Sequence, residues 1–146
     1  MTHDELYPEL VMDHSRRPHN FRQMPGATKE IEGFNPLCGD KLRLFVKLDG
    51  ERVEDVSFVG NGCAYSTASA SLMTDAVKGK SREEALRLMT RFHDVMTTDQ
   101  ADLAGLGKLE ALVPLRKNPL RVKCITLAWH ALKSALTGAA EAVSTE

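Results

Sequence analysis

Three cysteines and one aspartate are the residues of this sequence that are best suited to chemistry. Cys38 and Asp40 lie in the turn-like stretch Asn-Pro-Leu-Cys-Gly-Asp (35–40), whereas Cys63 and Cys124 lie far along the chain. Three thiolates and one carboxylate form a complete four-coordinate set for Zn²⁺. The cysteines do not form the close pairs typical of structural zinc sites, so their spacing also allows three unrelated buried thiols. Asp40 could likewise be a turn residue that bonds to nearby backbone.

Composition and charge argue against several classes of protein. The 146 residues include 19 Lys+Arg and 20 Asp+Glu, and the formal net charge of −1 does not favour binding to nucleic acid or to a membrane surface. We find no secretory signal and no apolar run long enough to span a bilayer. An odd number of irregularly spaced cysteines is a poor disulfide framework and favours thiol or metal chemistry in a reducing compartment. We therefore expect a cytoplasmic protein with one domain over 1–146 and frayed ends at 1–3 and 139–146.

The hydrophobic pattern predicts a small antiparallel sheet. Residues 29–34 favour a short strand, and residues 42–48 alternate between apolar and charged side chains. Asp49-Gly50 then predicts a type I′ hairpin turn, with 52–60 as the return strand. With the turn centred between Asp49 and Gly50, Cys38 and Cys63 differ by two residues in their distance from it. Antiparallel pairing should therefore bring both thiols to the same end of the sheet.

Helical patterns cover most of the remaining sequence. We expect helices over 4–15 and 65–78, the second capped by Ser66 or Thr67, and a third after the capping box at 81–84. Asn118 and Pro119 start a last helix that ends near Gly138, whereas the pattern between 91 and 118 is weak. Cys124 falls in the first turns of that helix, where the positive end of the helix dipole favours a thiolate. The prediction is an α+β domain with about three strands packed on one side by several helices.

The cysteine motifs resemble those of the IscU/SufU (NifU N-terminal-like) family of iron–sulfur cluster assembly proteins. The resemblance rests on Pro-Leu-Cys-Gly-Asp (36–40), Gly-Asn-Gly-Cys-Ala (60–64) and Arg-Val-Lys-Cys (121–124), which Leu-Ala-Trp (127–129) follows. Asp-His-Ser (13–15) and Pro-His-Asn (18–20) extend it toward the N-terminus. Lys123 stands where the IscU branch typically has histidine. This residue and the long segment between Cys63 and Cys124 favour the SufU branch.

The resemblance implies a zinc-bound sulfur acceptor, a sulfurtransferase that works with a pyridoxal-phosphate-dependent cysteine desulfurase (SufS-like) and supplies downstream iron–sulfur scaffold proteins. Cys38 would accept persulfide sulfur, and Cys38, Asp40, Cys63 and Cys124 would bind the zinc. Arg121 would assist the transfer, or it is a solvated surface arginine.

Two alternatives to the sulfur relay stay open, so the sequence does not decide whether the chain is an enzyme. The same four residues could carry iron in a [2Fe–2S] cluster that is assembled and passed on, or the chain could be a structural zinc domain for protein interaction. We expect His14, His19, His93 and His130 to be packing or surface residues without a metal, and we expect no nucleic-acid or membrane partner.

Overall fold

A mixed β-sheet forms one layer of the structure. The computed structural model describes residues 3–138 and 142–144, and within these ranges four strands pair in the order β3-β2-β1-β4. The strands are β1 (Lys29–Asn35), β2 (Asp40–Asp49), β3 (Arg52–Asn61) and β4 (Ala142–Ser144). Because β1, β2 and β3 pair antiparallel as predicted, the three-stranded core of the sheet is confirmed.

The fourth strand differs from the prediction. β4 pairs parallel with β1, with Ala142 opposite Glu32, although the segment 139–146 was expected to be frayed. Three residues are too few to show an alternating pattern, so only their docking on the edge of β1 makes them a strand. The other residues predicted to fray lie outside the described part of the chain, except His3, which begins the first helix.

The central hairpin forms, but its turn lies one residue later than predicted. Asp49 pairs with Arg52, so Gly50 and Glu51 are the central residues, and of the two only Gly50 has positive φ, at 59°. The predicted type I′ turn is therefore wrong, since that turn needs positive φ at both positions; glycine at the first position is typical of type II′. A bulge between Lys47 and Leu48 also shifts the register.

The shifted register improves the alignment of the two thiols. Lys41 pairs with Asn61. If this pairing continued beyond the strands, Cys38 would face the residue next to Cys63, so the two cysteines are offset by one residue instead of the predicted two. One residue is about 3.3 Å along a strand. The hairpin therefore carries both thiols to the same end of the sheet.

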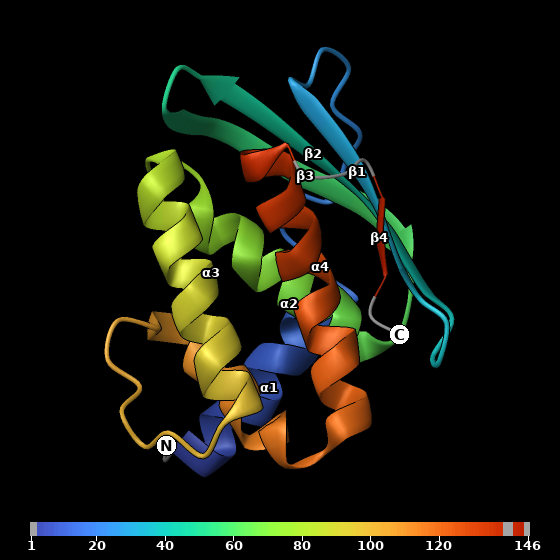
Figure 1. Cartoon of the computed structure of the whole chain (residues 1–146). Helices are drawn as coiled ribbons and strands as arrows, with labels where there is room; N and C mark the ends of the chain where they lie inside the picture. Colours follow the sequence, from blue (N-terminus) through green and yellow to red (C-terminus); the bar gives the residue numbers. More distant parts are fainter. Residues whose placement is uncertain (1–2, 139–141, 145–146) are drawn as a thin grey trace.

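The helices pack on one side of the sheet (Figure 1). They are α1 (His3–Arg16), α2 (Ala64–Val77), α3 (Arg82–Thr97), the 3₁₀ helix η1 (Gly107–Lys117) and α4 (Pro119–Thr137). The predicted starts of α3 and α4 are confirmed. Ser81 Oγ accepts a hydrogen bond from the Glu84 N–H, and the Asn118 side chain accepts from the first turn of α4. α4 ends as predicted at Gly138, which has a φ of 70°.

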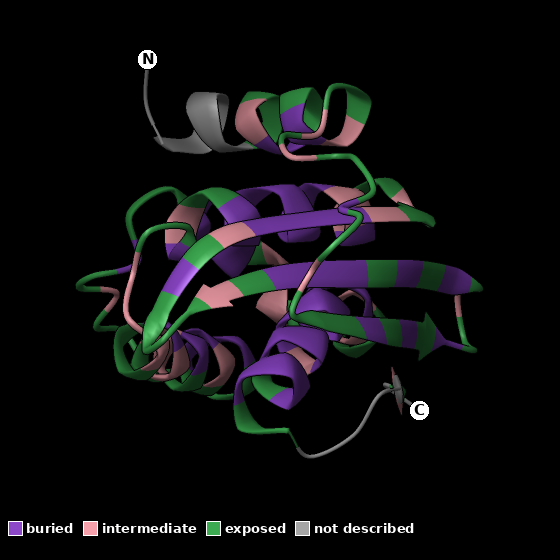
Figure 2. Ribbon diagram, turned by 90° about the horizontal axis from the view of Figure 1, so that it is seen from above, coloured by how far each residue is buried: buried purple, intermediate pink, exposed green. Residues whose placement is uncertain are grey.

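The hydrophobic core lies between the helices and the sheet, and its buried residues follow the inner faces of both layers (Figure 2). Trp129 of α4 is buried against Phe92 of α3, with ring centroids 4.8 Å apart. The indole N–H of Trp129 donates to Ser69 Oγ, so the polar edge of the ring is satisfied in the core. No helix in the described ranges is both long enough and apolar enough to cross a membrane.

Candidate metal centre

Cys38 lies at the tip of the turn between β1 and β2. Asn35 ends β1 and pairs with Asp40, the first residue of β2. The turn closes with a hydrogen bond of 2.9 Å from the Gly39 N–H to the Asn35 carbonyl, and Gly39 has a φ of 71°. Glycine adopts this left-handed conformation at little cost. The turn thus presents Cys38 half-buried, next to a Leu37 that is 59% exposed.

Two buried donors from other elements meet Cys38. Cys124 of α4 is 1% exposed, and its Sγ lies 3.2 Å from Cys38 Sγ. Asp40 is fully buried at the start of β2. One donor atom from each of Cys38, Asp40 and Cys124 lies within 4.8 Å of the other two. The structure therefore brings together three of the four residues that the sequence singles out.

Cys63 lies beside this cluster, but its sulfur is not part of it. The Cys63 N–H donates to Asp40 Oδ1 at 2.8 Å. Its Sγ instead accepts from the Ser66 N–H at 3.4 Å and caps α2, the place predicted for Ser66 or Thr67. That assignment of the cap is wrong, since α2 begins at Ala64 and the preceding side chain reaches its free N–H groups. Cys63 therefore lies next to the three gathered donors, and its sulfur contacts the start of α2.

Asn35 is a residue of the centre to which the sequence analysis gave no role. It is fully buried, and its Nδ2 donates to Asp40 Oδ2 at 3.1 Å and to Cys124 Sγ at 3.4 Å. Its Oδ1 accepts from the Leu37 N–H at 3.3 Å. The Asn-Pro pair at a turn was the available signal, because Asn side chains often bond to backbone two residues on. Asn35 thus holds the carboxylate, one thiol and the turn in place.

Arg121 lies near the thiols and is not a fully solvated side chain. Its guanidinium carbon is 4.6 Å from the ring centroid of Tyr65, a cation–π distance. Desolvation acts to lower the pKa of Arg121, but its electrostatic interactions with Cys63 and Cys124 outweigh that effect, and the net result is a raised pKa. A positive charge therefore lies within electrostatic reach of two of the three sulfurs.

The electrostatics of the cluster fit a bound cation. Burial raises the pKa of the Cys124 thiol, and its contacts with Cys38 and Asp40 raise it further. In the described ranges no lysine, arginine or histidine forms an ion pair with the buried Asp40. A buried carboxylate without a cationic partner is costly, and metal binding requires deprotonated thiolates. The sulfur and oxygen donors present here are those that Zn²⁺ accepts.

Comparison with known proteins now defines the class. The sequence profile of the NifU-like N-terminal domain matches residues 6–141, so the chain belongs to this family, the IscU/SufU group of iron–sulfur cluster assembly proteins.

Two relatives and one solved structure show how close the similarity is. The chain is 47% identical to the iron–sulfur cluster assembly scaffold protein IscU of Streptococcus pyogenes serotype M1, over 95% of this chain and 87% of the relative. It is 45% identical to the zinc-dependent sulfurtransferase SufU of Bacillus subtilis, over 89% of this chain and 88% of the relative. A crystal structure from Fervidobacterium islandicum AW-1, provisionally described as an iron–sulfur cluster assembly scaffold protein for the SUF system, superposes with a TM-score of 0.84 at 36% identity. It covers 88% of this chain and 94% of its own.

Proposed function

We propose that this chain is a zinc-dependent sulfur acceptor that takes persulfide sulfur from a pyridoxal-phosphate-dependent cysteine desulfurase for iron–sulfur cluster assembly. The observation that carries this proposal is the half-buried thiol of Cys38. It lies at the tip of the turn between β1 and β2, and its Sγ is 3.2 Å from the buried Sγ of Cys124. Such an arrangement combines access for a partner with a donor set for a metal. The name of the Bacillus subtilis relative, a zinc-dependent sulfurtransferase, supports the same function.

The zinc ligands in this proposal are Cys38, Asp40, Cys63 and Cys124. Three of them already have donor atoms within 4.8 Å of one another, and Cys63, whose N–H donates to Asp40, would complete the set. When bound, zinc would keep the thiols deprotonated at neutral pH. Without a cation, burial favours the protonated thiol at Cys124.

The transfer step is a thiol exchange at sulfur. The Cys38 thiolate attacks the terminal sulfur of a persulfide on the desulfurase, and a new S–S bond forms on Cys38 while the old S–S bond breaks. The desulfurase cysteine leaves as a thiolate, so charge and electrons balance without an external oxidant or reductant. Arg121, which lies close to Cys63 and Cys124, would offset the negative charge at the site during the exchange.

The position of Cys38 explains why it, and not another cysteine, should be the acceptor. Cys124 is 1% exposed inside α4, and Cys63 is built into the cap of α2. Cys38 lies on a turn between two strands, and the neighbouring Leu37 offers an exposed apolar contact to a partner. Cys63 is half-buried like Cys38, so the place of Cys38 on the turn, beside the exposed Leu37, is what favours it over Cys63 as the acceptor.

Incubation with a cysteine desulfurase and cysteine tests the proposal. We expect peptide mass spectrometry to find one added sulfur atom on Cys38, and Cys38→Ser to abolish that addition. Thermal unfolding of the variant shows whether the domain still folds, and desulfurase alone gives the background. Added sulfur on Cys63 or Cys124, with none on Cys38, would contradict the assignment of the acceptor.

The second candidate function is a scaffold on which a [2Fe–2S] cluster is built by the same residues. The name of the Streptococcus pyogenes relative, a scaffold protein at 47% identity, favours it. The two functions differ in what they transfer. A relay raises desulfurase turnover and contains zinc, whereas a scaffold shows cluster absorption and passes the cluster to an apo-protein.

A third possibility, a structural zinc domain for protein interaction, predicts a different effect of Cys38→Ala. In that case the variant loses zinc and stability, and neither the variant nor the original chain accepts sulfur. Sulfur acceptance by the original chain therefore rejects a purely structural role.

A further inference from the structure

A second cluster of metal-binding side chains lies away from the cysteine centre. His14 of α1, His19 of the segment that follows α1, and Asp75 of α2 each offer one ligand atom, and these atoms lie within 4.8 Å of one another. Cys63 caps the start of α2, whereas Asp75 lies twelve residues further along the same helix. At 1.5 Å per residue the two positions are roughly 18 Å apart along the helix axis, so one ion cannot use both clusters.

The cluster combines a buried anchor with two open ligands. His14 is 3% exposed, whereas the side chains of His19 and Asp75 are 53% and 41% exposed. The imidazole centroids of His14 and His19 are 4.4 Å apart, and His19 Nδ1 lies 2.5 Å from Asp75 Oδ2. An ion could thus reach the cluster from solvent and keep water as a further ligand.

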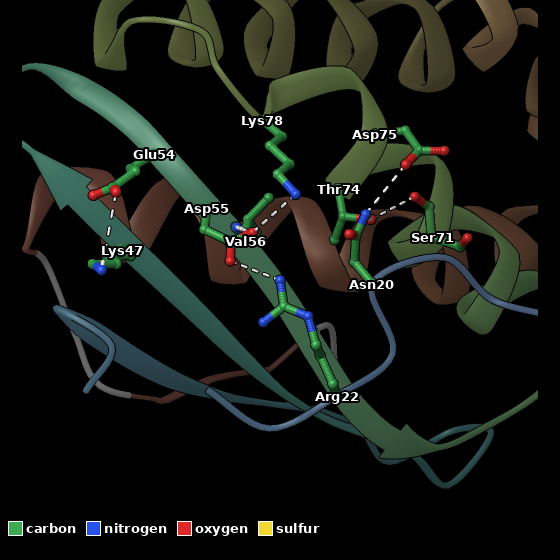
Figure 3. A network of polar contacts seen from close by, with 10 residues as sticks. All are labelled: Asn20, Arg22, Lys47, Glu54, Asp55, Val56, Ser71, Thr74, Asp75 and Lys78. Atoms are coloured by element: carbon green, nitrogen blue, oxygen red, sulfur yellow. Dashed lines mark hydrogen bonds and ion pairs between the residues drawn. The ribbon is translucent and has the colours of Figure 1, made fainter. Parts of the chain in front are cut away.

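Neighbouring groups orient the side chains of His14 and Asp75 and hold the backbone of His19. Ser71 Oγ lies 2.6 Å from His14 Nδ1, which leaves Nε2 of that ring for a metal, and it also accepts the backbone N–H of His19 at 2.7 Å. Asn20 Nδ2 donates to Asp75 Oδ1 at 3.2 Å (Figure 3). Metal-binding histidines and carboxylates commonly have such hydrogen-bond partners, which set the ring orientation and the tautomer.

We propose that His14, His19 and Asp75 form a second metal site, which takes a divalent first-row transition ion such as Zn²⁺ or Fe²⁺. Two imidazoles and one carboxylate are the protein ligands of many open zinc sites and of non-haem ferrous sites. The site should bind more weakly than a centre of three thiolates.

A bound ion would add a cross-link between three parts of the chain, of which α1 and α2 already pack against each other. These parts are the end of α1, the connection at 17–28 and the last turns of α2. The same connection is held further along by Arg22, which pairs with Asp55 of β3, and Asp55 also contacts Lys78 (Figure 3). Occupation of the site should therefore slow amide hydrogen exchange between α1 and β1.

Cobalt titration of the full chain, after one equivalent of zinc has been added, tests the proposal. We expect one equivalent of Co²⁺ to bind as the second metal ion, with visible d–d absorption and without a sulfur-to-cobalt charge-transfer band. His19→Ala and Asp75→Asn should each weaken this binding at least tenfold. His93→Ala is the matched control, because the His93 and His130 rings lie 5.7 Å apart but belong to no described cluster with a carboxylate.

The histidine ring signals give a second measurement that does not depend on the cysteines. Zn²⁺ should shift the NMR signals of His14 and His19 and leave those of His93 and His130 in place. Because His19 and Asp75 are exposed, changes there should leave the fold intact, which far-UV circular dichroism checks. Unchanged binding in both variants, no second equivalent, or a charge-transfer band that identifies thiolate ligands would each overturn the second site, whatever the outcome of the sulfur-transfer experiment.

Discussion

Replacement of Asn35 by alanine should weaken both the fold and the metal centre. The Asn35 amide donates to the buried Asp40, with Nδ2 at 3.1 Å from Oδ2. The same amide group contacts Cys124 Sγ at 3.4 Å. After the change, Asp40 keeps the Cys63 N–H as a partner, and the buried carboxylate loses the hydrogen bond from the Asn35 amide.

The size of the effect follows from these contacts. A buried hydrogen bond to a charged group contributes about 1.5–3 kcal/mol. With the weaker bond to sulfur and the small cavity that remains, we expect a loss of about 3 kcal/mol in the unfolding free energy. For a chain of this length that loss lowers Tm by roughly 6–12 °C. Loss of a residue that orients metal ligands should also lower zinc affinity by roughly 10–100-fold.

Thermal unfolding and zinc competition measure the two effects separately. Tm is recorded with excess chelator and with excess zinc, and the zinc affinity is measured against a chromophoric chelator. Ser81→Ala is the control, because it removes the cap of α3 and costs about 1 kcal/mol without a contact to the centre. If Asn35→Ala binds zinc as tightly as the original chain, or if its chelated form melts at the same temperature, the role given to Asn35 is wrong.

Three further predictions concern Gly62, Arg121 and His130. Gly62→Ala would place a Cβ 2.9 Å from Asp40 Oδ1, so zinc affinity in the same competition assay should fall about tenfold; an unchanged affinity would show that the carboxylate can move freely. Arg121→Ala should slow single-turnover sulfur transfer roughly tenfold, and Arg121→Lys should restore part of the rate, because lysine keeps the positive charge but not the planar group that stacks on Tyr65; an unchanged rate in Arg121→Ala would contradict this role. Burial lowers the pKa of His130 below its ordinary 6.5, so the unfolded chain binds more protons and stability should fall as the pH drops below 6.5. Urea unfolding of His130→Gln should show a smaller fall, and an equal slope would argue against this origin.

The central hairpin shows how much of the fold the sequence could predict. Apolar alternation in β2 and β3 is strong because one face of the sheet is buried, and that alternation fixes which residues point inward. The turn was misplaced by one residue because Asp49-Gly50 is compatible with more than one turn type. β4 could not be predicted, since its three residues gain their structure from pairing with β1 and from packing against α4.

The centre could be predicted to the extent that sheet register and helix position determine it. Cys38, Asp40 and Cys124 meet because the turn between β1 and β2 and the first turns of α4 lie next to each other. The cap made by Cys63 depends on a side-chain rotamer, which residue spacing does not specify. The pairing of His19 with Asp75 depends on a connection without periodicity, so only the three-dimensional structure could show it.

The contrast between the three gathered donors explains how one centre could both hold a metal and release a thiol. Asp40 and Cys124 are fixed by a strand, a helix and the buried Asn35, so moving either one disturbs the core. Cys38 is held by a turn whose Gly39 adopts a conformation that other residues avoid. A partner that draws Cys38 outward therefore needs to change only a few backbone angles, while the buried donors stay in place. Sulfur acceptance should then be sensitive to changes in the turn that holds Cys38. Metal retention should be sensitive to changes at the buried Asn35, Asp40 and Cys124.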